Sequence, residues 1–250
     1  MSPVLEVMRD NDVCSLILNR PEKMNALDAE LVEALIQAIE EANASGVRLI
    51  VLSGRGKNFS AGFDQGGLER ESDADLLLRL VRIETLLHLL ASSPCLTLAF
   101  AQGRNFGAGV DLFATCKQRF CSAEATFRMP GLMFGLVLGT RRFAGLVGHS
   151  KAREILERTA TFSGTDALAL GLASGLCETE ERELAIDQTR RTATLFDPKT
   201  QAHLYRVLDR EQADQDMADL VSSASRPGLK ARMIAYMNSK EDASLTSGRC

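Results

Sequence analysis

Two glycine-bearing turns carry the residues of this sequence that are best suited to chemistry. The first is Ser60–Asp64 and the second is Gly103–Asp111. Each follows an apolar run, and the second leads into Leu112–Ala114, which we predict to be helical. Glycine lets a backbone approach a ligand closely, and the first N–H groups of a helix lack partners within that helix. Two such N–H groups aimed at one point would form an oxyanion hole, which stabilises negative charge developing on a reacting oxygen.

Side chains that could transfer a proton occur on the stretch Ser72–Leu90, whose apolar periodicity predicts a long helix. Glu84 and His88 lie one helical turn apart on it and therefore share a face. They could supply an acid or a base, and a solvated helix face or a partly buried histidine is the alternative interpretation. The six cysteines include no CxxC pair and no metal-like spacing with the three histidines. We therefore predict no metal site and a reduced, cytoplasmic setting.

The composition is that of an ordinary soluble globular protein. Of the 250 residues, 45% are hydrophobic and 25% are charged, and the formal net charge is -4. That charge gives no reason to expect nucleic acid as a partner. There is no long apolar run that would predict a membrane span, and the N-terminus lacks the form of a signal peptide.

Predicted strands and helices alternate through the first two thirds of the chain. A hairpin is expected from Leu5 to Leu18 around the turn at Asn11 and Asp12, and a helix begins near Asp28. Further strands are predicted at Val47–Leu52, Leu96–Ala101 and Arg119–Cys121, with the Ser72–Leu90 helix between the first two. Such alternation indicates an α/β core with covered faces.

Beyond Ser150 the pattern changes to helices, and no strand of similar strength is expected. The predicted helices cover residues 151–158, 165–170, 180–195, 198–208, 212–223 and 228–238, and the last dozen residues look frayed. We therefore predict an α/β core over residues 1–195 and a helical tail over residues 196–250.

Four motifs resemble the enoyl-CoA hydratase/isomerase family, also called the crotonase superfamily. They are Leu18–Leu27, Phe59–Asp64, Gly103–Leu112 and Phe162–Ala173, and they occur in the family's order and spacing. The resemblance implies a crotonase-like spiral of ββα units, with C-terminal helices that pack trimers and often dimers of trimers. It also implies an acyl-CoA thioester as the partner, with coenzyme A entering as part of the substrate and no further cofactor. A homotrimer or homohexamer is the expected assembly, and the helical tail is its expected oligomerisation region.

The resemblance also implies roles for individual residues. The backbone N–H groups of Phe63 and Ala108 match the donors that hold the thioester oxygen, and one such donor is worth on the order of 3 kcal/mol. The family's adenine-binding stretch and its neighbourhood match Lys23, Met24, Ala26, Ala61 and Asp64. Arg128 stands beside the pocket, where it could bind a carboxylate or carbonyl of the acyl group or form a surface salt bridge. Tyr236 and Lys240 occupy sequence positions near those at which the family offers an aromatic ring and a lysine to a neighbouring subunit's coenzyme A.

The sequence departs from the hydratase pattern at both catalytic acids. Asp111 matches the first glutamate of typical hydratases, and Gly131 stands where the second should be. Water addition uses two groups, so we expect Asp111 to shuttle a proton in an isomerase-type reaction of a thioester enolate. A purely structural aspartate in the first turn of a helix is the alternative for Asp111. The alternative functions are hydration with a non-standard second acid such as Glu84, thioester hydrolysis, and a catalytically silent scaffold subunit.

Overall fold

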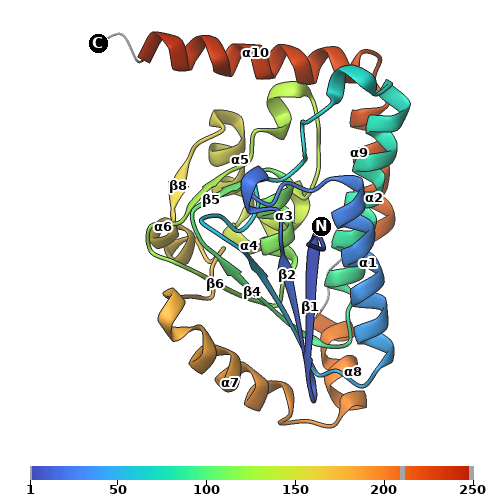
Figure 1. Cartoon of the computed structure of the whole chain (residues 1–250), viewed down its shortest axis with the longest axis vertical. Coiled ribbons are helices and arrows are strands. Elements are labelled where there is room, and N and C mark those ends of the chain that lie inside the picture. Colours follow the sequence, from blue (N-terminus) through green and yellow to red (C-terminus); the bar gives the residue numbers. More distant parts are fainter. Residues whose placement is uncertain (1, 209–211, 248–250) are drawn as a thin grey trace.

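The computed structural model describes residues 2–208 and 212–247, with side chains described as far as Ser239. The described residues form two sheets (Figure 1). The six-stranded sheet has the order β1-β2-β3-β4-β6-β9, and the three-stranded sheet has the order β5-β7-β8. The strands are β1 (Leu5–Asp10), β2 (Val13–Leu18), β3 (Leu49–Gly54), β4 (Leu96–Ala101), β5 (Arg104–Phe106), β6 (Gln118–Cys121), β7 (Thr126–Arg128), β8 (Phe162–Ser163) and β9 (Gly175–Leu176).

The predicted hairpin is confirmed, because β1 and β2 pair antiparallel with Asp10 opposite Val13. The next strands of the large sheet pair in parallel, from β2 through β3, β4 and β6 to β9. In the small sheet β5 and β7 are parallel, whereas β7 and β8 are antiparallel. This mixed α/β architecture confirms the predicted fold class.

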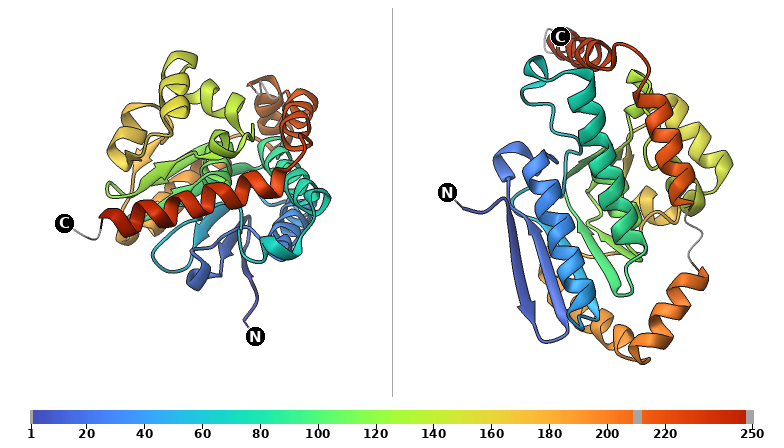
Figure 2. Two further views of the ribbon diagram at one scale, coloured as in Figure 1. Left: turned by 90° about the horizontal axis from the view of Figure 1, so that it is seen from above. Right: turned by 90° about the vertical axis from the view of Figure 1, so that its right-hand side faces the viewer.

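Helices cover the sheets, interspersed with the strands as far as β9 and following them after it. They are α1 (Ala29–Ala44), α2 (Asp73–Ala91), α3 (Ala108–Thr115), α4 (Thr140–Val147), α5 (His149–Arg158), α6 (Gly164–Ala169), α7 (Arg182–Ala193), α8 (Pro198–Leu208), α9 (Ala213–Ala224) and α10 (Leu229–Ser247). Short 3-10 helices are η1 (Pro21–Lys23), η2 (Leu68–Arg70), η3 (Gly131–Phe134) and η4 (Thr179–Glu181). Helices α1 and α2 lie side by side along one side of the large sheet (Figures 1 and 2).

Local sequence signals explain where the two long helices begin. The Asp28 carboxylate accepts a hydrogen bond from the Leu31 N–H at the start of α1. Ser72 and Asp75 form a capping box at the start of α2, each side chain bonding the other residue's backbone N–H. The apolar residues predicted to form the stripes of these helices are buried. Those of α1 pack with strand residues of the large sheet, whereas Leu76 and Leu80 of α2 pack against α9 and α10. Capping and periodicity therefore fix both helices as predicted.

Four of the shortest strands were not predicted from the sequence. Strands β5 and β7 contain three residues each, and β8 and β9 contain two. Such segments are too short to show a period of two, yet they build the small sheet and the last edge of the large one. Helix α10 also extends to Ser247, beyond the predicted end at residue 238.

The last two helices pack on the same chain that carries them. Helix α9 contacts α2, and α10 lies across one end of the molecule, where it contacts η3 (Figures 1 and 2). Their buried side chains join a second apolar core made of Leu68, Leu76, Leu80, Phe134, Leu136, Leu220, Ala224, Leu229, Met233 and Tyr236. The division at residues 195 and 196 and the oligomerisation role of the tail stay predictions. Among the described residues, no helix is both long and apolar enough to span a membrane.

Candidate active site

The two glycine turns predicted from the sequence pack directly against each other. Gly62 has a φ of +79°, and a Cβ atom on it would overlap the Phe106 carbonyl oxygen and lie 3.0 Å from the Ala108 nitrogen. A Cβ atom on Gly109 would likewise overlap the Ser60 carbonyl oxygen. The Phe106 N–H donates to that same Ser60 oxygen at 3.1 Å. The glycines are therefore required by contact between the turns, not only by their backbone angles.

The Phe63 and Ala108 N–H groups are suitably placed to donate to a ligand. Ala108 is the first residue of α3, where a helix has no partner for its N–H groups. In residues 2–208 and 212–247, neither N–H donates to a protein acceptor, and both residues line the same cavity. The Gly107 N–H donates to the Arg128 carbonyl at 2.8 Å, which holds the turn in place. Their assignment as the two oxyanion donors stays a prediction.

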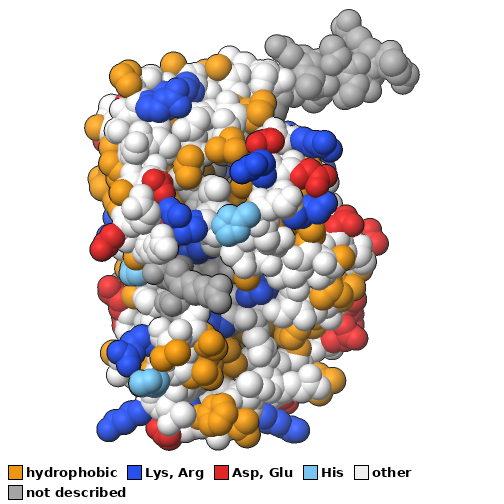
Figure 3. Space-filling view, turned by 180° about the vertical axis from the view of Figure 1, so that it is seen from behind, with side chains coloured by type: hydrophobic (Ala, Val, Ile, Leu, Met, Phe, Trp, Pro, Cys, Tyr) orange, Lys and Arg blue, Asp and Glu red, His pale blue; other side chains and the backbone are white. Residues whose placement is uncertain are grey.

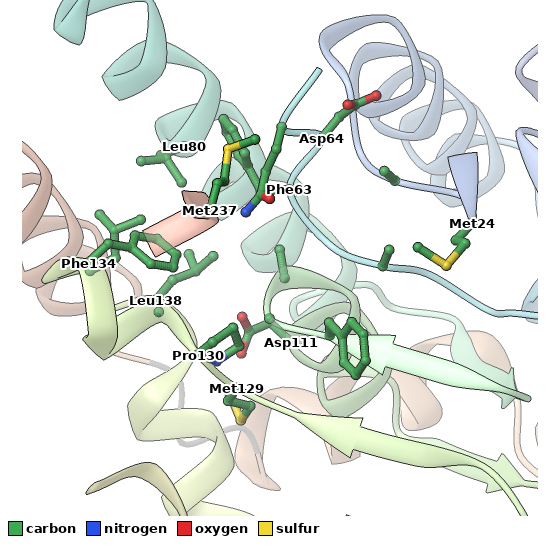
Figure 4. Close-up of a pocket in the computed structure, with 18 of the residues that line it drawn as sticks. Met24, Phe63, Asp64, Leu80, Asp111, Met129, Pro130, Phe134, Leu138 and Met237 are labelled. Carbon is green, nitrogen blue, oxygen red and sulfur yellow. The ribbon is translucent and has the colours of Figure 1, made fainter. Parts of the chain in front are cut away.

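The cavity has a volume of about 530 Å³ and two chemically different sides (Figure 4). Met24 and Asp64 lie toward one side of it, near the turn after η1. On the other side the wall is apolar and comes from α2, η3, α10 and the loop before α4, with the side chains of Leu80, Phe134, Leu136, Leu138 and Met237. The turns that carry Phe63 and Ala108 lie between the two sides.

Asp111 supplies a carboxyl group to this cavity from the first turn of α3. It is 3% exposed, and its Oδ1 atom has no hydrogen-bond partner among the described residues. Burial raises the pKa of the Asp111 carboxyl well above its ordinary range, the Arg142 guanidinium opposes this, and Glu84 adds to it. Gly139, with a φ of +62°, lies so close that a Cβ atom there would overlap Oδ1. The structure therefore presents a buried carboxyl that holds its proton more tightly than a solvated aspartate.

Glu84, the candidate second acid, does not reach the cavity. It is 1% exposed and forms an ion pair with Arg142, whose Nη2 atom lies 2.5 Å from its Oε1 atom. Arg142 also lies 3.7 Å from an oxygen of Asp216 on α9. Glu84 is thus committed to a buried ion pair that joins α2 to α4, and it is absent from the cavity lining. Its proposed role as a second acid gains no support from this position.

The stretch matched to adenine binding lies at the cavity as expected, since Lys23, Met24, Ala26, Ala61 and Asp64 all line it. The Ala61 N–H donates to the Met24 carbonyl at 2.9 Å and so joins this stretch to the first glycine turn. Met24 and Asn25 both have positive φ angles, of 50° and 53°. Contacts of their neighbours hold them in this sparsely populated region.

Asn25 is the residue that shapes this stretch, and we did not single it out from the sequence. It is fully buried, and its side-chain amide donates to the carbonyls of Arg55 and Asn58. Its Oδ1 atom accepts from the Arg20 N–H at 2.8 Å. One side chain therefore ties this stretch to the loop that follows β3. The signal available in the sequence was its place inside the first family motif.

Asp64 lines the cavity but is already engaged by the protein. Its carboxylate lies 2.8 Å from the Arg20 guanidinium and accepts from the Gly66 N–H at 2.8 Å. Burial acts to raise its pKa, but the hydrogen bond from Gly66 and the charges of Arg20 and Arg79 hold that pKa below the ordinary range. The Arg79 guanidinium also stacks on the Phe63 ring, 4.1 Å from its centroid. Asp64 therefore fixes the shape of the first turn.

The remaining predicted site residues lie elsewhere. The Arg128 Nε atom donates to the Thr159 carbonyl at 3.1 Å, and the residue is not part of the cavity lining. Tyr236 is buried against the Phe134 ring at 5.2 Å between centroids, whereas its neighbour Met237 lines the cavity. The side chain of Lys240 lies outside the described residues. Met237 was not predicted, because nothing local marks a methionine in a helical tail as a pocket residue.

Comparison with known proteins agrees with this geometry. The model of the enoyl-CoA hydratase/isomerase family matches residues 8–241. The chain therefore belongs to the enoyl-CoA hydratase/isomerase family, as the motifs indicated, and it is an enzyme of that kind acting on acyl-CoA thioesters.

Individual relatives show how widely the family's reactions differ. The chain is 32% identical over 208 residues to "Probable enoyl-CoA hydratase echA6" of Mycobacterium bovis, covering 82% of each chain. It is 31% identical to a peroxisomal Delta(3,5)-Delta(2,4)-dienoyl-CoA isomerase of Arabidopsis thaliana, covering 68% of each. Its fold matches the crystal structure of a "putative enoyl-CoA hydratase/isomerase" from Bordetella parapertussis with a TM-score of 0.93 and 50% identity, over 94% of this chain and 99% of that one.

Proposed function

We propose that the protein moves a proton within an enoyl-CoA thioester, as an isomerase does, rather than adding water to the double bond. One observation carries this proposal: among the described residues that line the cavity, Asp111 is the single buried ionisable side chain. At Gly131, the position matched to a second carboxylate, there is no side chain. Hydration as typical relatives perform it uses two acids, whereas isomerisation needs one group that takes a proton and returns it.

The reaction follows from the positions of three groups. The Phe63 and Ala108 N–H groups would donate hydrogen bonds to the thioester oxygen and stabilise the charge of the enolate. The ionised Asp111 carboxylate would take a proton from the carbon next to the thioester, giving a dienolate and a neutral acid. The same acid would then return the proton to the far end of the conjugated system, which shifts the double bond and regenerates the carboxylate. No cofactor takes part, and coenzyme A stays on the substrate throughout.

The rival readings need groups that the described cavity does not offer. Hydration or thioester hydrolysis would require a second group to activate water, and Glu84 is held in its ion pair with Arg142. A silent scaffold would have no use for a buried carboxyl beside two N–H groups that have no protein acceptor within the described part of the chain. Relatives named as peroxisomal and mitochondrial mean that a cytoplasmic location stays a prediction.

Exchange of the α-proton tests the proposed function. A saturated acyl-CoA in deuterated water should exchange its α-protons with the wild-type protein, and Asp111→Asn should slow this by about 10²- to 10⁴-fold. Binding of the ester should be retained, because the variant keeps the shape of the side chain. Equal exchange rates for the two proteins would remove Asp111 from the mechanism, and no exchange by either would favour the scaffold.

We also propose that the chain assembles as a homotrimer or homohexamer. Apolar side chains remain exposed on and just before α8, namely Leu195, Phe196, Leu204, Val207 and Leu208. Hydrophobic side chains also stand out on the face of the molecule seen in Figure 3. Burial of such surface between subunits would stabilise an assembly. Light scattering should give a mass of three or six chains, and the mass of one 27.2 kDa chain would contradict this.

A further inference from the structure

The apolar side of the cavity is closed by the last helix of the same chain. Met237 of α10 lies beside Leu80 of α2 and Phe134 of η3, on the far side of Phe63 and Asp111 from Met24 (Figure 4). Met237 is half-buried, whereas Met233, one turn earlier, is buried in the second apolar core. Met237 therefore stands at the boundary between that core and the cavity.

Polar contacts fix the first turn of α10 and thereby the position of Met237. The Asp73 carboxylate, from the first residue of α2, accepts hydrogen bonds from the N–H groups of Gly228, Leu229 and Lys230 at 2.8 to 3.1 Å. These are N–H groups that a helix start leaves without internal partners. One acidic side chain thus ties the start of α10 to the start of α2.

Two basic side chains complete this attachment. The Lys230 ammonium donates to the carbonyls of Glu69 and Glu71, beside η2. The Arg232 Nε atom donates to the Phe134 carbonyl at 3.0 Å, on the element that lines the cavity next to Met237. Helix α10 is therefore held to the segment around η2 and to η3. Met237 consequently has a defined position relative to Phe134 of η3.

The chemistry of the wall limits what can lie against it. Its side chains are aliphatic, aromatic or thioether groups. Among the described lining residues, the ionisable ones besides Asp111 are Asp64 and the two residues that directly precede Met24 in the chain, Glu22 and Lys23. Arg128, which could have met a second carboxylate, is bonded to the Thr159 carbonyl outside the cavity. A charged group placed against this wall would lose its hydration without gaining a partner.

On the basis of the proposed function, we propose that Met237 is the residue that sets the length of the acyl chain, and that this chain is an uncharged aliphatic one. The thioester would lie at Phe63 and Ala108, and the tail would run toward Leu80, Phe134 and Met237. A methionine suits such an end wall, because its flexible thioether fills irregular space and adapts to chains of different shape.

Two substitutions of Met237 test this proposal. The assay measures dissociation constants and α-proton exchange for a series of saturated acyl-CoA esters that differ by one methylene. Met237→Ala should move the preferred length upward, with affinity rising about fourfold for each methylene that enters the vacated space. Met237→Phe should move it downward. An unchanged length profile in both folded variants would overturn the assignment of Met237.

Control variants distinguish the proposed role of Met237 from the proposed isomerase function. Met133→Ala makes the same chemical change at a residue that is 59% exposed and outside the lining, and Met233→Ala perturbs α10 without touching the cavity. Neither should shift the length profile, and a shift by Met233→Ala equal to that by Met237→Ala would overturn the proposal. If the wild type exchanges no α-proton with any ester, the proposed function fails, while the binding profile still tests Met237.

An ester with a terminal carboxylate tests the claim about charge. Its affinity should fall at least tenfold below that of the uncharged ester of equal length, and Met237→Ala should not restore it. Equal or tighter binding of the charged ester would contradict the assignment of an uncharged chain.

Discussion

Gly62 and Ala108 approach each other so closely that a Cβ atom on residue 62 would lie 3.0 Å from the Ala108 nitrogen. This contact sets the spacing between the N–H group of the following residue, Phe63, and that of Ala108. Because the same Cβ atom would overlap the Phe106 carbonyl, a side chain at Gly62 must push the two turns apart. The oxyanion site proposed here therefore depends on the lack of a side chain at this position.

We predict that Gly62→Ala removes turnover. It should also destabilise the fold more than the same substitution at a glycine with a similar backbone angle does. Gly46 has a φ of +77° and nothing within 4 Å of its would-be Cβ atom, so Gly46→Ala is the matched control. The control should lose about 1–2 kcal/mol through its positive φ alone. Gly62→Ala should lose about 1–3 kcal/mol more through overlap. Chemical denaturation measures both, and equal losses with normal turnover would contradict the contact.

The pKa of Asp111 should make stability depend on pH. Its native pKa is raised by burial, so between the unfolded and native pKa values the unfolded chain has lost this proton and the native chain has kept it. The contribution is fully present below the unfolded pKa and is lost as pH rises through the native pKa, at about 1.4 kcal/mol per pH unit. Asp111→Asn should lack this slope. If the unfolding free energies of the wild type and of Asp111→Asn changed equally with pH from acid to neutral, this contribution of Asp111 would be disproved.

Glu84 should act through stability rather than through proton transfer. Glu84→Gln breaks a buried ion pair with Arg142 and should lower the free energy of unfolding by about 3–5 kcal/mol. Glu33→Gln, which breaks the exposed pair with Arg82, should lower it by about 0–1 kcal/mol. Folded Glu84→Gln should keep most α-proton exchange. A stable variant that has lost exchange as fully as Asp111→Asn would instead make Glu84 a catalytic acid.

Asp73 should position Met237 from a distance. Its pKa is lowered chiefly by the hydrogen bond from the Lys230 N–H, so its stabilisation of α10 is present at neutral pH and is lost as pH falls through the native pKa. Asp73→Asn should speed amide exchange at Lys230 and broaden the acyl-length profile at neutral pH. Asp197→Asn, which removes the equivalent charge at the start of α8, should do neither. If amide exchange at Lys230 became faster while the acyl-length profile stayed the same, the attachment of α10 would not control chain-length specificity.

The sequence predicted most of the elements that position this site and fewer of the side chains that complete it. Strands β1 to β4 and helices α1 and α2 carry long periodic patterns and local caps at Asp28 and Ser72, so local rules suffice. Strands β5 and β7 are too short for a period and form because neighbouring segments supply their partners. The buried ion pair of Glu84 could not be predicted, because its partner Arg142 lies far along the chain. The place of Met237 in the cavity depends on the packing of α10 near Leu80, and no local sequence signal predicts that packing.

The most direct test of the central claim compares two substrates in deuterated water. A 3-enoyl-CoA and a 2-enoyl-CoA are supplied separately, and mass spectrometry follows the double-bond position, the deuterium content and the addition of water. We predict that the 3-enoyl ester is converted to the conjugated 2-enoyl ester, and that Asp111→Asn abolishes this conversion. Rapid hydration of the 2-enoyl ester with no change in the 3-enoyl ester would show a hydratase and contradict isomerisation.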